Sequence, residues 1–572
     1  MSVTIPARVW APAARGVALV TGDGARTAMA RDPERAGWWE GPGLAVGADY
    51  WFSPDGEGPF PDPRSRWQPA GVDGPSRAWA PDPGHEWVPC PDRPVLGGVI
   101  EEIHVGTFTA EGTLDAAADH LHELADLGVG TVELMPVAQF SGEFGWGYDG
   151  VDLFAVHRAY GGPDALVRFV DRAHALGLAV CLDVVLNHLG AWGNHLSRFG
   201  PYYSERHQTP WGPGFDLDGP DSREPRAFLL DVCRHWLVDL HVDALRLDAV
   251  HAILDDSPRH LVAELADRVA QWRAETGRRL TLIAESDLNQ PALVTARARG
   301  GAGLDAQWDD DVHHALFVAL TGETQGYYAD FADPDALPHA LSDVFYHDGR
   351  WSSFRGREWG APVPADLDRR RFVAFFQDHD QVGNRAAGDR PSASLDEAQL
   401  AGAAAIVLLG SWTPMLFQGE EWGTRTPFRY VADQETEDRA RMTREGRRAE
   451  FGRHGWSGDV PDPTSRETLR SCVLDRAERR EPAGRRMLAW YRTLIGLRET
   501  LPGVGEGHRM AAAWEDGVLV LDNAGARVEA DLRGRALPAA GSAAGGDEVV
   551  ARFPSSRGPG DAVRVSRKDQ RR

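Results

Sequence analysis

Three acidic side chains, an arginine and several histidines stand at the ends of short apolar segments in the middle of the chain. In 242–251, VDALRLDAVH, the first half alternates apolar and polar residues, which indicates a short β-strand. Arg246 and Asp248 are two residues apart and therefore share one face of that strand. Because a buried carboxylate without a partner is costly, Arg246 is the expected counter-charge of Asp248. Such a pair could simply tie a strand down, but the acids at other segment ends favour a site.

Polar groups also follow three other apolar segments. They are Asp183, Asn187 and His188 after the first, Glu285 after the second, and His379 and Asp380 after the third. Three converging acids suit cleavage of a glycosidic bond: one carboxylate attacks the anomeric carbon, a protonated one donates to the leaving oxygen, and a third steadies the oxocarbenium-like charge. Trp146 and Tyr148 offer aromatic rings that could stack on the sugars.

The elements that must position these groups alternate between strands and helices. The predicted strands are 99–104, 131–136, 179–184, 242–247, 280–284, 304–308, 372–376 and 414–417. Most are separated by segments of helical periodicity, such as 114–127, 163–176 and 259–276. Eight strand–helix units predict an α/β fold, a closed (β/α)8 TIM barrel, whose active groups gather at the C-terminal ends of the strands. The long stretch 187–223 has little helical pattern and is expected to be a functional loop.

A chain of 572 residues is too long for one core, so further domains are expected. Short apolar runs between Gly, Pro and Asp predict an N-terminal β-sandwich of carbohydrate-binding type within 1–95, with 59–94 as a linker laid over a neighbour. Its aromatic residues are assigned to the core. The catalytic barrel is expected over 96–505, and a small C-terminal β-domain with a frayed tail over 506–572.

Charge and composition narrow the classes of function. A net charge of −24 argues against nucleic acid as a partner, because so acidic a surface repels phosphates. No apolar run approaches eighteen residues, and the N-terminus lacks the pattern of a signal peptide, so a cytoplasmic protein without a membrane span is expected. Lys568 is the only lysine, which leaves a Schiff-base mechanism without a plausible residue.

Neither a cofactor nor a metal is expected. The four cysteines form no C-x-x-C pair, so neither a zinc site nor a disulfide framework is indicated. No H-x-H or H-E-x-x-H spacing occurs at the strand ends. The most metal-like group is His313–His314 after three aspartates, for which a solvated helix start is the alternative interpretation.

Four stretches give the chain a family resemblance. LDVVLNH at 182–188, DALRLD at 243–248, the Ala284–Glu285 pair and the His379–Asp380 pair resemble the signature stretches of the α-amylase family of retaining glycoside hydrolases. The resemblance implies Asp248 as nucleophile, Glu285 as general acid/base and Asp380 as transition-state stabiliser. It also implies that Arg246 orients Asp248, that His188 and His379 hydrogen-bond the sugar being cleaved, and that Tyr148 stacks under it.

Finer motifs resemble one subfamily, the malto-oligosyltrehalose trehalohydrolases. They lie at 61–69, 133–138, 145–150, 305–308, 313–314, 381–385 and 417–422. This resemblance implies retaining cleavage of the α-1,4 bond next to the terminal trehalose unit of malto-oligosyl trehalose, which releases trehalose. It also implies a functional pairing with a malto-oligosyltrehalose synthase. The implied substrate contacts are Tyr148, Asp183, His188, Arg246, His251, Asp310, Asp311, His314, His379, Gln381, Asn384 and Arg385.

Three positions depart from the family pattern. Asp378 replaces a usual Asn, Gln139 a usual Glu and Phe144 a common polar residue. Asp378 is expected to add a negative charge beside the catalytic acids.

Two other functions stay open. One is a 1,4-α-glucan branching enzyme, which would use the same three acids. The other is a non-catalytic glucan-binding scaffold, although such proteins typically lose the acids that this chain keeps. In the long loop, Trp192, Trp211 and Phe215 could grip the trehalose unit or be buried to hold the loop's own shape.

Overall fold

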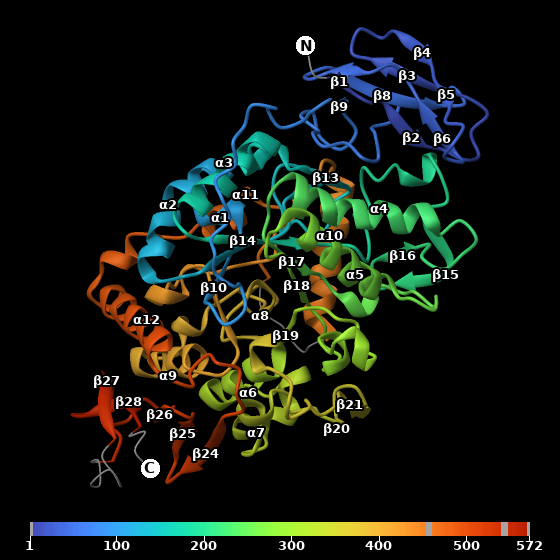
Figure 1. The fold of residues 1–572 in the computed structure, drawn as a ribbon. Coiled ribbons are helices and arrows are strands. Elements are labelled where there is room, and N and C mark those ends of the chain that lie inside the picture. Colours follow the sequence, from blue (N-terminus) through green and yellow to red (C-terminus); the bar gives the residue numbers. More distant parts are fainter. Residues whose placement is uncertain (1–3, 454–459, 539–546, 569–572) are drawn as a thin grey trace.

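The computed structural model describes residues 4–453, 460–538 and 547–568. Its centre is a closed barrel of eight parallel strands in sequence order (Figure 1). These are β10 (Ile100–Ile103), β11 (Thr131–Leu134), β14 (Ala179–Val184), β17 (Ala244–Leu247), β18 (Thr281–Ala284), β19 (Ala306–Asp309), β22 (Phe372–Phe375) and β23 (Thr413–Phe417). Pairing of Ile100 with Met415 closes the barrel. All eight predicted strands and the predicted fold class are confirmed.

Helices surround the barrel, as Figure 1 shows. They include α2 (Leu114–Leu127), α3 (Gly162–Ala175), α4 (Arg223–Arg234), α5 (Leu261–Thr276), α6 (Asp310–Thr321), α7 (Ala336–Asp343), α9 (Glu397–Leu408) and α12 (Pro482–Thr500). Capping hydrogen bonds and residues with positive φ determine where these helices begin and end. Thr113 accepts a hydrogen bond from the Ala116 amide at the start of α2, and Gly128 ends that helix with φ 102°. The three helices predicted above are confirmed to within two residues at either end.

Alternate residues of each barrel strand have different surroundings. Cys181, Ile283 and Phe375 pack with one another inside the barrel, whereas Leu182 and Leu282 belong to the cluster that packs against the helices. This alternation follows from the two-residue period of a strand. It also determines which side chains point inward at the C-terminal ends.

Smaller sheets lie at both ends of the chain. The N-terminal sheets have the orders β4-β3-β8-β9, β2-β6-β5 and β1-β7, and the C-terminal sheet is β24-β25-β26-β28-β27. The N-terminal strands are β1 (Thr4–Ile5), β2 (Arg8–Trp10), β3 (Val17–Thr21), β4 (Arg26–Ala28), β5 (Ala30–Arg31), β6 (Trp38–Glu40), β7 (Leu44–Ala45), β8 (Asp49–Pro54) and β9 (Ser76–Arg77). The C-terminal strands are β24 (Ala511–Glu515), β25 (Val518–Asp522), β26 (Ala526–Ala530), β27 (Glu548–Pro554) and β28 (Asp561–Arg567).

The aromatic residues of the N-terminal sheets are largely buried, as Trp10, Trp39 and Phe52 illustrate. The linker lies over the barrel, where Arg64 and Arg66 pair with Asp231 and Asp239 at 2.7 and 2.9 Å. The domain boundaries near 95 and 505 stay predictions. The tail is expected to be frayed, and its last residues, 569–572, lie outside the described residues.

The long loop after β14 contains a β-hairpin, β15 (Tyr203–Thr209) and β16 (Gly212–Phe215). Phe215 at the end of β16 is buried, whereas Trp211 at the turn of the hairpin is 51% exposed. Two of the three candidate aromatics therefore have opposite positions, and the third, Trp192, is half-buried with the Arg439 guanidinium carbon 4.1 Å from its ring centroid. Within the described parts of the chain, the helices are all too short or too polar to span a membrane.

Candidate active site

The three acids that the sequence singled out meet at one cavity of about 780 Å³. Asp248 follows β17, Glu285 follows β18, and Asp380 lies in α8 (His379–Gly383) after β22. Asp248 and Glu285 continue the inward-facing positions of their strands, two residues beyond Arg246 and Ile283. The other residues that line the cavity are Trp146, Tyr148, Asp149, His188, Leu189, Gly190, Ala191, Trp211, Ala249, His251, Asp287, Asn384, Tyr430, Val431, Met442, Thr443, Gly446 and Arg447.

Arg246 is a fully buried cation beneath the cavity. Its Nη1 donates to Asp248 Oδ1 and to Asp183 Oδ2, both at 2.8 Å. Its Nη2 lies 3.6 Å from Glu285 Oε2. Asn187 Nδ2 donates to the second carboxylate oxygen of Asp248 at 2.9 Å. Both oxygens of Asp248 thus accept from donors that hold the carboxylate in a fixed position, as a nucleophile requires.

Glu285 has fewer compensating donors. The Ala249 amide donates to its Oε2 at 2.7 Å. Burial raises the pKa of the Glu285 carboxyl; the charge of Arg246 opposes this shift, while that of Asp248 adds to it. A carboxyl with a raised pKa keeps its proton toward neutral pH and can act as a general acid. The two carboxyls beside Arg246 are therefore differentiated by their surroundings.

A buried chain of hydrogen bonds runs across the barrel beneath the cavity, from Glu102 to Asp183. Glu102 in β10 accepts from His379 Nδ1 at 2.5 Å, and His379 Nε2 donates to the Tyr148 hydroxyl at 2.8 Å. Tyr148 in turn donates to Asp183 Oδ2 at 2.5 Å. Burial opposes a charge on His379, but Glu102 and Asp380 outweigh it and raise the pKa of the imidazole to about 10. The histidine is therefore a fixed cation at neutral pH.

Glu102 is a residue that the sequence reasoning missed. It stands in the buried strand IEEI, and an acid in a buried strand was the available signal. Its role depends on His379, which lies 277 positions away. The structure also brings Trp308 into the site, where its ring lies 4.4 Å from the Arg246 guanidinium carbon.

Four predicted substrate contacts line the cavity: Tyr148, His188, His251 and Asn384. His188 stacks on Trp211 with 4.8 Å between ring centroids, and its Nε2 donates to the Tyr148 carbonyl at 2.9 Å. Asp183, Arg246 and His379 lie directly beneath these residues in the network described above. Asp310 lies near the catalytic acids. Burial raises the pKa of its carboxyl, and the negative charges of Glu285 and Asp287 raise it further.

Four other predicted contacts lie apart from the cavity lining. Gln381 Oε1 accepts hydrogen bonds from the hydroxyls of Tyr327 and Tyr328. Asp311 accepts from Asn289 Nδ2 and the His347 amide, His314 packs among the rings of Tyr327, Tyr328 and Phe331, and Arg385 pairs with Glu323 and Asp389. Direct substrate contact by Asp311, His314 and Arg385 stays a prediction. Asp311 and Arg385 are paired within the protein, whereas His314 packs against rings and its Nε2 has no hydrogen-bond partner among the described residues.

Two interpretations of the sequence need correction. The start of α6 is not solvated: Asp309, Asp311 and His313 are 0%, 4% and 2% exposed. His313 is held by the Phe376 carbonyl and the Tyr328 hydroxyl. Asp378 is buried and accepts from the Gln381 amide, and burial raises the pKa of its carboxyl well above the usual range. This environment favours a neutral Asp378 rather than the expected added charge.

The side chains at the other two positions that depart from the family pattern are both buried. Gln139 donates through Nε2 to the Phe140 carbonyl and accepts from the Arg158 amide. Phe144 is buried.

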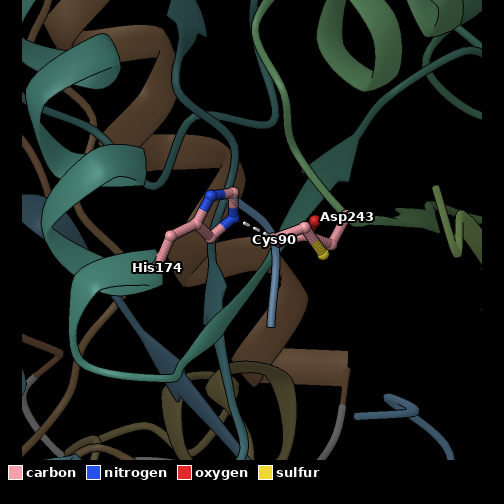
Figure 2. A group of neighbouring side chains, drawn as sticks. All are labelled: Cys90, His174 and Asp243. Carbon is pink, nitrogen blue, oxygen red and sulfur yellow. Dashed lines mark hydrogen bonds and ion pairs between the residues drawn. The ribbon is translucent and has the colours of Figure 1, made fainter. Parts of the chain in front are cut away.

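Among the described residues, two groups could hold a metal by proximity: Cys90, His174 and Asp243, and His207, Asp218 and Asp256. In the first, shown in Figure 2, His174 of α3 and Cys90 of the linker point toward Asp243, which precedes β17. Asp243 accepts from His174 Nε2, the Val180 amide and Arg278 Nη2. Burial and Asp243 raise the pKa of the Cys90 thiol to about 12. The carboxylate already has its cation and the thiol keeps its proton, so this group ties the linker to the barrel.

Comparison with known proteins agrees with this geometry. The catalytic-domain model of the alpha-amylase family matches residues 76–207. A malto-oligosyltrehalose trehalohydrolase from Arthrobacter ramosus is 51% identical over 543 residues, which is 92% of each chain.

The chain belongs to the malto-oligosyltrehalose trehalohydrolases of the α-amylase family.

Two further similarities place this trehalohydrolase-family chain among its neighbours. The crystal structure of a Salmonella typhimurium protein assigned as an alpha amylase superposes with a TM-score of 0.88, at 34% identity, and covers 99% of this chain and 98% of the other. A 1,4-alpha-glucan branching enzyme from Xanthomonas euvesicatoria is 31% identical, but over only 54% of this chain and 48% of its own. The branching-enzyme alternative is thus the more distant relationship.

Proposed function

We propose that this protein hydrolyses the α-1,4-glucosidic bond next to the terminal trehalose unit of malto-oligosyl trehalose and releases trehalose. The observation that carries the proposal is the 51% identity to a named malto-oligosyltrehalose trehalohydrolase over 92% of the chain. The three acids around one cavity supply the chemistry that such an activity needs.

The reaction proceeds by double displacement. Glu285 donates its proton to the glycosidic oxygen while Asp248 attacks the anomeric carbon, so that trehalose leaves and a glycosyl ester forms on Asp248. Arg246 and Asn187 hold the Asp248 carboxylate in position for this attack. Asp380 stabilises the positive charge that develops on the sugar ring.

Water then completes the cycle. Glu285, now ionised, removes a proton from a water molecule that attacks the same carbon and releases Asp248. Two inversions leave the α-configuration. A retaining mechanism needs the two carboxyls about 5–5.5 Å apart, which adjacent strands such as β17 and β18 can supply.

The substrate implies a supplying reaction. Trehalose at the chain end requires an enzyme that converts the terminal α-1,4 link of a malto-oligosaccharide into a 1,1 link. We therefore expect a malto-oligosyltrehalose synthase as functional partner. Metal independence and a cytoplasmic location stay predictions, which chelator treatment and cell fractionation test.

Product analysis tests the proposal. The protein is incubated with malto-oligosyl trehalose and, separately, with the malto-oligosaccharide of equal length. We expect trehalose and an initially α-configured malto-oligosaccharide from the first substrate, and much slower cleavage of the second. Equal rates without trehalose release would reject the proposal, and new branches in amylose would point to the branching enzyme.

A further inference from the structure

Two acidic side chains lie at the same level inside the barrel, on adjacent strands. Glu102 of β10 and Glu133 of β11 are paired in register, and both are almost completely buried. Both oxygens of Glu102 accept hydrogen bonds. No N–H or O–H group among the described residues donates to either oxygen of Glu133. Glu133 is therefore the matched comparison for Glu102: a buried acid at the same level without such donors.

Both donors to Glu102 belong to His379. The His379 backbone amide donates to Oε2 at 2.9 Å, and ring Nδ1 donates to Oε1 at 2.5 Å. One carboxyl group therefore holds the backbone at the start of α8 and the rotation of the ring together. Asp380 is the next residue, so the position of its backbone follows from that of His379.

The hydrogen bonds around the His379 ring have one consistent direction. The Tyr148 hydroxyl donates its proton to Asp183 Oδ2 at 2.5 Å, and that oxygen also accepts from Arg246. The hydroxyl therefore accepts from His379 Nε2 at 2.8 Å. Since Nδ1 donates to Glu102, both ring nitrogens carry a proton and the imidazole is a cation.

Glu102 is the buried counter-charge of this cation. The titratable groups that face the ring are Glu102, His104, Tyr148, Asp183, Asp378 and Asp380. Burial raises the pKa of the Asp378 carboxyl well above its usual range and lowers the pKa of His104 to about 4, which favours the neutral form of both. Asp380 Oδ2 lies 3.6 Å from Nε2, but its side chain is 44% exposed, so water weakens the attraction.

We infer that Glu102 is a positioning residue for the cleavage step, which acts through His379 on Tyr148 and Asp380. Glu102 does not line the cavity, so it touches neither the substrate nor the reacting atoms. By holding the His379 ring and its backbone, it fixes the platform under the sugar and the acid that stabilises the transition state. The inference rests on the proposed function for these roles of Tyr148 and Asp380.

Two replacements separate the charge of Glu102 from its reach. Glu102→Gln keeps the length, but its amide has one oxygen acceptor, so it cannot accept from both the His379 amide and Nδ1. Either the ring loses its Nδ1 proton and becomes neutral, or a buried backbone amide loses its partner. Glu102→Asp keeps the charge, but it is one methylene too short to hold both contacts.

The ratio of variant to wild-type kcat, measured from about pH 5 to about pH 8.5 on malto-oligosyl trehalose, tests the role of the charge. In the wild type, Glu102 and Asp380 outweigh burial and raise the pKa of His379 to about 10, so the cation persists over this range. In Glu102→Gln, the buried ring should titrate at or below the ordinary histidine pKa of about 6.5 and lose its charge as pH rises.

We expect kcat of Glu102→Gln to be about 10–100-fold lower than that of the wild type at about pH 8, with a smaller deficit at about pH 5. KM should change little, because Glu102 does not touch the substrate. Glu102→Asp should lose activity by the same factor at every pH. A loss of folded protein also lowers the rate equally at every pH, so the pH dependence of the Gln variant distinguishes the charge effect from misfolding.

Glu133→Gln is the matched control and should keep kcat within about twofold of the wild type at every pH, because Glu133 makes no contact with His379. A double variant tests the route. Glu102→Gln combined with His379→Asn should be no slower than His379→Asn alone, since Glu102 acts through that ring. A pH-independent ratio in Glu102→Gln, an equal loss in Glu133→Gln, or additive losses in the double variant would overturn the inference.

A second substrate separates this inference from the proposed function. If the wild-type protein cleaves the malto-oligosaccharide of equal length and releases no trehalose from malto-oligosyl trehalose, the proposed function fails. The same ratios measured on the malto-oligosaccharide then still test Glu102. Unchanged kcat and pH dependence in Glu102→Gln, with trehalose released, would reject the inference while the proposed function holds.

Discussion

At the scale of single residues, Asp248 and Glu285 differ in the donors that reach them. Arg246 and Asn187 satisfy both oxygens of Asp248, whereas Glu285 receives one backbone amide and lies 3.6 Å from the same guanidinium. Two carboxyls thus have different surroundings, and burial raises the pKa of the Glu285 carboxyl, as a general acid requires.

Replacing Asp248 with Asn should reduce kcat by at least about four orders of magnitude, because an amide cannot form the glycosyl ester. The free energy of unfolding should fall by about 1–3 kcal/mol as Arg246 loses one charged partner. Initial rates and urea unfolding measure these effects. Asp366→Asn, at a carboxylate with 67% of its side chain exposed, is the matched control. Substantial activity in a folded Asp248→Asn protein would exclude Asp248 as nucleophile.

Replacing Glu285 with Gln should affect substrates unequally. Turnover of malto-oligosyl trehalose should drop by about 10²–10⁴, while an aryl glycoside with a good leaving group should lose less in its first step. Because its raised pKa keeps Glu285 protonated toward neutral pH, wild-type kcat/KM should decline on the alkaline side. Rate profiles from pH 4 to 9 should lose that limb in the variant. An unchanged limb would assign the titration to another group.

Glu133 in β11 contributes a pH-dependent stability. Burial, with added effects of Glu102 and Asp183, raises the pKa of its carboxyl to about 8. The folded state therefore binds a proton that the unfolded state has lost, so the free energy of unfolding should fall as pH rises from about 4.5 to about 8. Unfolding at several pH values should show a shallower fall for Glu133→Gln. The same slope in both proteins would contradict this cause.

At the scale of elements, a hairpin attached to the barrel carries one aromatic wall of the cavity. Trp211 projects from the turn between β15 and β16 and stacks on His188. The hairpin of β20 (Arg350–Ser352) and β21 (Arg357–Trp359) carries another exposed ring, Phe354, outside the cavity lining. The barrel thus fixes the acids, and its long connections shape what binds beside them.

Replacing Trp211 with Ala should raise KM for malto-oligosyl trehalose by up to about tenfold with little change in kcat, because a stacking surface at the cavity is lost while the acids stay in place. Steady-state kinetics measure both constants. Trp514→Ala, at an exposed ring of the C-terminal sheet, serves as the control. A large loss of kcat with unchanged KM would show that Trp211 instead positions His188.

At the scale of the whole molecule, a net charge of −24 coexists with a neutral oligosaccharide as substrate. Charge steers only charged partners over distance, so the acidic surface should not affect substrate capture. We expect kcat/KM to change less than about twofold between about 0.05 and about 0.5 M salt, where screening of surface charge becomes strong. A steep dependence on salt would show that substrate binding is coupled to charged groups that screening reaches.

The sequence by itself determined the barrel, because apolar residues recur with a period of two residues in strands and of 3.6 residues in helices. It also placed Asp248, Glu285 and Asp380 at strand ends, where a closed barrel must bring them together. These features depend on residues that are neighbours along the chain, so the spacing of residues in the sequence is enough to predict them.

Only the tertiary structure decided how each side chain is surrounded. It paired Glu102 with His379 across 277 positions, enclosed Asp378 where its pKa rises, and exposed Trp211 while it buried Phe215. It also joined Arg355 to Asp287. Burial and long-range pairing are set by which elements close against one another, and no local spacing in the chain records that.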